Sequence, residues 1–159
     1  MFKVINRIAG LLLICVSAYA QAEPTVSVQL SSTTVNVGDV VTAEVWLNDF
    51  PQTQGGSFTV KFSKKVLKVE SVTVDEQIWN MASNPGVVKA KKGKIKNVAF
   101  ASFPGLSGNV LAATIEFSVI GKGKGKVKLL PSGANPFAGG GELIDVSYSS
   151  AKLKSKNKK

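Results

Sequence analysis

The chain has 159 residues, with 20 Lys and Arg against 10 Asp and Glu, so its formal net charge is +10. It contains no His and a single Cys. These counts exclude a nucleophilic triad with an imidazole base, a His-ligated zinc site and a disulfide within the chain.

The first residues have the pattern of a secretory signal peptide. Basic residues precede an apolar run over residues 8–18, which is too short to span a bilayer comfortably, and small-x-small cleavage sites follow. We therefore expect residues 1–22 to be removed and the protein to be exported, to the periplasm or out of the cell. Cleavage after Ala22 would also remove the only Cys and the only Arg. No later segment is predicted to span a membrane.

The positive charge is concentrated in the second half. Residues 23–87 carry four Lys and seven acids, whereas residues 88–159 carry fourteen Lys and three acids. A basic half attracts polyanions such as acidic polysaccharides or acidic proteins. The alternative, which we take as the default, is a solvated face whose lysines keep edge strands from pairing with other molecules. The lack of Arg and of interleaved aromatic residues argues against nucleic acid.

Apolar and polar residues alternate along most of the chain, which predicts β-strands. In chain order, strands are expected at residues 26–30, 41–47, 58–62, 67–74, 86–90, 94–103, 110–120, 124–130 and 143–153. Leu67 and Val69 lie in one phase and Val72 and Val74 in the other, so a bulge is predicted at Glu70-Ser71.

Gly- and Pro-containing turn signals separate these segments. They lie at residues 37–39, 54–56, 84–86, 92–93, 103–105 and 131–141. Short strands at this spacing predict an all-β fold, an antiparallel β-sandwich of about nine strands. Residues 75–82 hold one helical turn at most, and Trp79 within them is expected to plug one end of the sandwich. Residues 154–159 are expected to form a basic, frayed tail.

Several motifs occur in an order that resembles a known family. They are Gly38 to Pro51, Gly56 to Leu67, Lys92 to Phe100, Ala113 to Val119, Gly133 to Phe137 and Val146 to Tyr148. Together they resemble a cohesin domain, the module that binds dockerins in cellulosome-type assemblies. The resemblance implies a β-sandwich of jelly-roll topology over residues 23–153. Gly55, Ser57 and Phe62-Ser63-Lys64 depart from the family's pattern, so the resemblance implies the fold more strongly than dockerin binding.

The resemblance also implies a non-catalytic module that binds another exported protein, possibly in the manner of a dockerin. Its binding face would be the sheet that contains the third and sixth strands. The outward positions there are expected to be Ser57, Thr59, Lys61, Asn97, Ala99 and Ala101. These side chains are small or polar, which favours a flat partner surface. No cofactor is expected in this chain, and any calcium would belong to the partner.

Trp46 suggests a second function. Its neighbours Val45 and Leu47 are in the inward phase, so its indole is expected to face outward, where it could stack on a sugar or anchor a protein. Carbohydrate or cell-surface polyanion binding, through Trp46 and the lysines, is therefore the alternative hypothesis. The other interpretation of Trp46 is that a neighbouring segment covers it. The carboxylates are expected on the solvated surface, so the sequence does not predict an enzyme.

Overall fold

The computed structural model describes residues 22–157, which form β-strands almost throughout. The predicted signal peptide therefore falls, apart from Ala22, on residues that the structure does not describe. The strands are β1 (Thr25–Leu30), β2 (Thr34–Asn36), β3 (Val40–Phe62), β4 (Leu67–Thr73), β5 (Ala82–Asn84), β6 (Val87–Lys89), β7 (Lys94–Val119), β8 (Gly123–Pro131), β9 (Ala138–Gly139), β10 (Glu142–Leu143), β11 (Ser147–Tyr148) and β12 (Ser150–Lys156). A single 3-10 turn, η1, covers Ala90–Lys92. Within residues 22–157, no helix is long and apolar enough to cross a membrane.

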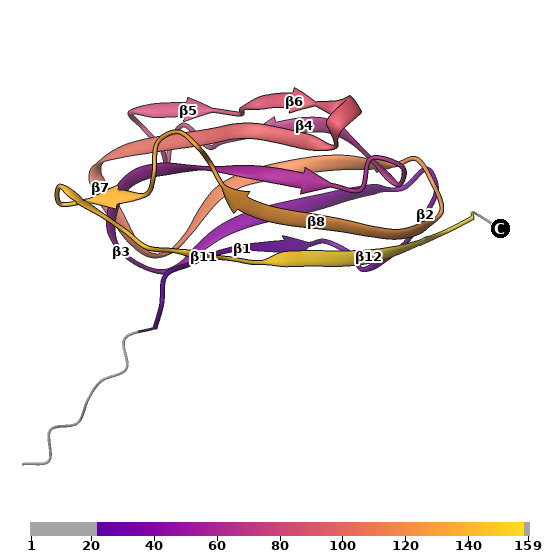
Figure 1. Cartoon of the computed structure of the whole chain (residues 1–159), viewed down its shortest axis with the longest axis horizontal. Coiled ribbons are helices and arrows are strands. Elements are labelled where there is room, and N and C mark those ends of the chain that lie inside the picture. Colours follow the sequence, from indigo (N-terminus) through magenta and orange to yellow (C-terminus); the bar gives the residue numbers. More distant parts are fainter. Residues whose placement is uncertain (1–21, 158–159) are drawn as a thin grey trace, which may run out of the picture.

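Two long, bent strands hold the two layers together. β3 and β7 pair in antiparallel register from Val40 opposite Ser118 to Lys61 opposite Lys94. The first half of β3 also pairs with β1, and the second half of β7 with β4, which makes the first layer. The second half of β3 pairs with β8, and the first half of β7 with β5 and β6, which makes the second layer. Figure 1 shows β5 and β6 along one edge of the molecule and β1 and β12 along the opposite edge.

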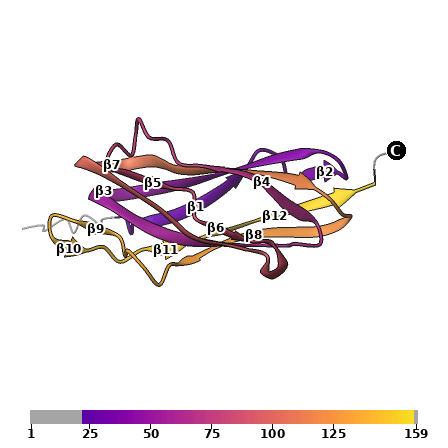
Figure 2. The same cartoon turned by 90° about the horizontal axis from the view of Figure 1, so that it is seen from above.

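β12 closes one side of the sandwich. It pairs with β8 in antiparallel register and with β2 in parallel register, and β11 adds a short parallel pairing with β1. Residues 154–156 belong to β12, so the prediction that they begin a frayed tail is wrong. Leu153 and Ser155 are buried, which shows that the alternating lysines here are the outer face of a strand. Figure 2 places the end of β12 opposite the end that carries β9 and β10.

The core is built by the predicted inward phases. In β3, Val41, Ala43, Val45 and Leu47 are buried, as are Phe58, Val60 and Phe62 further along. Aromatic rings join the layers at ring-centroid distances of 5.5 Å for Phe62 and Phe117 and 4.2 Å for Trp79 and Phe100. Trp79 is buried, in line with its predicted role inside the sandwich.

The main departures from the predicted fold concern where the strands begin and end. The expected turns at residues 54–56 and 103–105 are wrong, because both segments lie inside the long strands β3 and β7. A side chain at Gly56 would collide with the ring of Phe137, so this glycine permits close packing within a strand. About nine strands were expected and twelve are assigned in the described part, because long strands merge some segments and short bridges add others. The predicted bulge is confirmed by a register shift between Val69 and Ser71.

Candidate binding face

The outer surface of the second layer, called here the binding face, carries most of the predicted site residues. Thr59 and Lys61 on β3 and Asn97, Ala99 and Ala101 on β7 are exposed or half-buried, in the predicted outward phase. The structure therefore brings these five residues onto one surface. Asn97 lies at a bulge between two register positions of β7, with a positive φ of 56°, and its Oδ1 accepts a hydrogen bond from the Ser132 hydroxyl at 2.9 Å.

Ser57, the remaining predicted residue of β3, is not exposed on the binding face. It is 1% exposed, and its hydroxyl donates to the carbonyl oxygens of Ala134 and Asn135, the latter at 2.9 Å. The loop over residues 132–137 therefore covers it. The expectation that Ser57 faces outward to a partner is wrong, because a segment far along the chain takes up that space.

The loop also borders a depression in the face. We call this depression the alanine hollow, and its volume is about 490 Å³. Its lining includes Gly55, Ala82, Asn84, Ala99, Ala101 and Asn135. The backbone register explains the small side chains, since Ala101 lies opposite Gly55 on one side and Ala82 on the other. The face is thus hollowed at this end, where a flat surface was expected.

Two large apolar side chains beside the hollow were not among the predicted site residues. Phe103 is 68% exposed and Met81 is 66% exposed. The backbone N–H of Met81 donates to the carbonyl of Ala101 at 3.0 Å. Phe103 is held by Asn80, which accepts from its N–H at 3.0 Å and donates to its carbonyl at 3.1 Å. Phe103 shares the phase of Ala99 and Ala101 and ends the expected strand over residues 94–103, so the period of two could have placed it on the face.

The other end of the binding face is cationic. Lys61 on β3 lies opposite Lys94 on β7 and opposite Lys128 on β8, and Lys94 in turn lies opposite Lys89 on β6. These four residues form a row across four strands, called here the lysine row. In the described residues the one ion pair joins Lys68 and Glu70, at 3.0 Å, so no carboxylate neutralises the row.

Trp46 lies elsewhere, on the outer surface of the first layer. It is half-buried, opposite Ser27 on β1 and Leu111 on β7. Its indole N–H donates to the carboxylate of Glu44 at 3.1 Å. The outward orientation is as predicted, but the structure does not bring Trp46 together with the other site residues.

The acidic side chains serve local structure. Glu70 accepts a hydrogen bond from the Ser118 hydroxyl at 2.6 Å and pairs with Lys68, and these two contacts, that of Ser118 first, lower the pKa of Glu70. Asp75 accepts from the N–H of Gln77 at 2.8 Å. Among residues 22–157, no group of three or more acidic, His or Cys side chains is arranged to hold a metal ion.

These features describe an all-β sandwich whose one face joins an apolar hollow to a row of lysines. The cohesin domain profile matches residues 26–157, and the chain belongs to the cohesin domain family. The fold is a jelly-roll β-sandwich, as the strand spacing predicted for the sandwich and the family resemblance implied for its topology. The sequence matches no curated protein.

Solved structures of cohesins share this fold at low sequence identity. A non-cellulosomal cohesin from Archaeoglobus fulgidus has a TM-score of 0.70 at 17% identity, over 86% of this chain and 93% of that one. A cohesin module of a Clostridium perfringens family 33 glycoside hydrolase has a TM-score of 0.68 at 11% identity, over 86% and 98%. The third ScaC cohesin of Acetivibrio cellulolyticus, solved in complex with the ScaB dockerin, has a TM-score of 0.65 at 19% identity, over 84% and 97%.

Proposed function

We propose that this chain is a non-catalytic protein-binding module whose partner docks on the binding face. The observation that carries the proposal is the alanine hollow with Phe103 and Met81 exposed beside it. Large apolar side chains exposed next to a depression favour binding, because a partner that covers them removes apolar surface from water. Aromatic side chains that become buried against a partner often contribute much of the binding energy of a protein interface.

A dockerin-like domain of another protein is the partner class that we propose. The support is the membership of the cohesin family, together with relatives that were solved in complex with dockerins. The site here would differ in chemistry from the pattern expected of the family, since Gly55, Ala99 and Ala101 line the hollow with small groups. Any requirement for calcium would lie in the partner. The signal expected at residues 1–22 suggests that the two proteins meet outside the cytoplasm.

The described surface supports sugar binding through Trp46 less well than protein binding on the binding face. Trp46 is half-buried, its N–H is occupied by Glu44, and it lies on the layer opposite the hollow. We therefore place the function on the binding face and not on Trp46.

The test is retention of a partner from the producing organism's own extract. The full-length chain is immobilised at low and at high salt, with and without a calcium chelator, and retained proteins are identified by mass spectrometry. Ala99→Arg fills the hollow and Phe103→Asp removes the apolar anchor, whereas Gln29→Arg changes an exposed residue of the first layer. We expect one protein to be retained at high salt by the wild type and by Gln29→Arg, and to be lost with the other two.

Thermal melts of all variants are compared first, so that loss of retention is not loss of folding. Equal retention by the folded Ala99→Arg and Phe103→Asp variants would overturn the proposed site. A partner that the chelator releases would support the dockerin-like class.

A further inference from the structure

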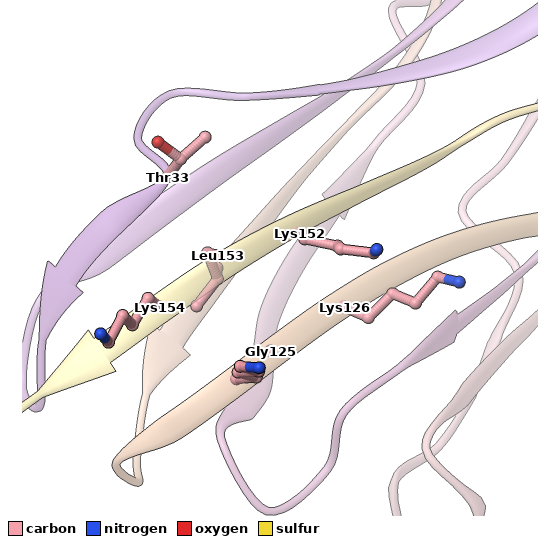
Figure 3. Close-up of a pocket in the computed structure, with 7 residues that line it drawn as sticks. Thr33, Gly125, Lys126, Lys152, Leu153 and Lys154 are labelled. Atoms are coloured by element: carbon pink, nitrogen blue, oxygen red, sulfur yellow. The ribbon is translucent and has the colours of Figure 1, made fainter.

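A second set of lysines lies where β8 meets β12, further along the outer surface of β8 from Lys128. In the sheet register Lys126 lies opposite Lys152, and Lys124 lies opposite Lys154. All four side chains are exposed. Figure 3 shows Lys126 and Lys152 extending side by side from the neighbouring strands.

This arrangement is unfavourable for the isolated protein. Like charges directly opposite each other on one face of an antiparallel pair destabilise the sheet. In the part of the chain that the structure describes, the one ion pair is that of Lys68 and Glu70, so no carboxylate lies between these lysines. An external anion would remove the repulsion, and its binding would be favoured for that reason.

A depression lies at these paired lysines. It has a volume of about 500 Å³ and is lined by the four lysines, Thr33, Gly125 and Leu153. The side chain of Leu153 occupies the space that a Cβ at Gly125 would take, on the inner side of the strand pair. We call this depression the lysine groove.

The cationic surface continues past the groove. A neighbouring hollow of about 560 Å³ shares Lys124 and is also lined by Lys61, Lys64, Lys65, Lys92 and Lys122. No acidic residue lines either depression. Their lysines therefore present a continuous positive potential to any ligand that approaches this end of the molecule.

We propose that the lysine groove binds an extended acidic segment of the partner protein. The inference rests on the proposed function, because it takes the occupant to be a protein. Lysines at alternate positions of β8 repeat about every 6.7 Å, which is two residues of a β-strand. An extended polypeptide repeats its own same-side side chains at the same distance, so alternate Glu or Asp residues would match the lysines one to one.

The chemistry of the lining agrees with such a segment. Lys presents a compact ammonium group that pairs with a single carboxylate without the planar geometry that Arg requires. The aliphatic stems of the lysines give the uncharged side chains of the segment an apolar surface to lie on. The groove has no aromatic lining on which a sugar ring could stack.

Fluorescence anisotropy on the full-length chain tests the proposal. The probes are a labelled 12-residue peptide with Glu and Thr in alternation, a peptide of the same composition with all Glu in one block, and labelled polygalacturonate. The groove variant is Lys126→Glu with Lys152→Glu. The matched control is Lys91→Glu with Lys96→Glu, which makes the same change in net charge at exposed lysines that line neither the groove nor the neighbouring hollow.

We expect the alternating peptide to bind more tightly than the block peptide and the polysaccharide, and to weaken as salt rises. The groove variant should weaken its binding by about tenfold or more, and the control by less than about twofold. Equal losses in both variants, equal binding of the two peptides, or tighter binding of polygalacturonate would each overturn the proposal.

The extract experiment separates this inference from the function on which it rests. If the groove variant retains the partner as well as the wild type while Ala99→Arg loses it, the binding face stands and the groove proposal falls. If no variant or wild-type chain retains a protein, the proposed function itself falls.

Discussion

The indole N–H of Trp79 donates a hydrogen bond to the backbone carbonyl of Leu111 at 3.0 Å, and the Trp79 ring is almost completely buried. Replacing Trp79 with Phe keeps an aromatic ring against Phe100 but removes this bond and part of the volume. We expect a loss of about 1–3 kcal/mol in the free energy of unfolding, measured by urea denaturation.

Trp46→Phe is the matched control, because Trp46 is half-buried and its N–H bonds a carboxylate at the surface. Its cost should stay below about 1 kcal/mol. A Trp46 variant that is the less stable of the two would contradict this account of the two indoles.

Phe117 is a second test of the core. Its side chain is fully buried and packs on Phe62 with ring centroids 5.5 Å apart. Phe117→Ala should cost about 3–5 kcal/mol, because it removes a large buried ring and leaves a cavity. Phe103→Ala, at an exposed ring, should change stability by about 0.5 kcal/mol or less. A thermal melt in which the two variants lose equally would show that the burial pattern is wrong.

The hydrogen bond from Ser118 lowers the pKa of Glu70 below its ordinary value of 4.5. A carboxyl group whose pKa is lower in the folded state contributes stability above its unfolded pKa, and that contribution is lost as pH falls through the folded pKa. Ser118→Ala should therefore raise the pKa of Glu70, as an NMR titration of its carboxyl carbon would show. Ser71→Ala should not, because the Ser71 hydroxyl bonds Glu116. If the pKa of Glu70 is unchanged in Ser118→Ala, the contact with Lys68 alone lowers this pKa, and the role given to Ser118 is wrong.

Neutralising one lysine of the β8–β12 pairs should stabilise the protein. Lys126→Gln removes the repulsion between Lys126 and Lys152. The expected gain is about 0.2–1 kcal/mol in the free energy of unfolding at low salt. The gain should shrink at high salt, where the charges are already screened. Urea denaturation at two salt concentrations measures both quantities, and a loss of stability at low salt would show that the opposed lysines do not repel.

The period of two identified the strands and the inward residues of β3 because each layer has one buried face. It could not show that Gly55-Gly56 lies within a strand, since glycine is equally suited to a turn and to close packing against a distant ring. The burial of Ser57 depends on a loop nearly eighty residues further along the chain. Residues 154–156 resemble a solvated tail until β8 and β2 are placed beside them.

The sequence predicted which residues share the candidate surface, but it did not predict the shape of that surface. The outward phase placed Thr59, Lys61, Asn97, Ala99 and Ala101 correctly on one surface. Whether that surface is flat or hollow depends on the register of neighbouring strands, which brings Gly55 and Ala82 against Ala101. The alternation of lysines was visible, but their cross-strand opposition was not, because it arises from pairings between distant segments.

The closure of the sandwich by β12 has a mechanical consequence. The chain enters the fold just before β1 at one end of the long axis, and β12 ends at the other (Figure 1). β1 is joined to β11 by a parallel pairing, and β12 continues directly from β11. Tension between Thr25 and Lys156 would therefore pull these strands lengthwise past each other. In that direction the hydrogen bonds between strands are loaded together in shear, so the strand arrangement resists stretching along the long axis.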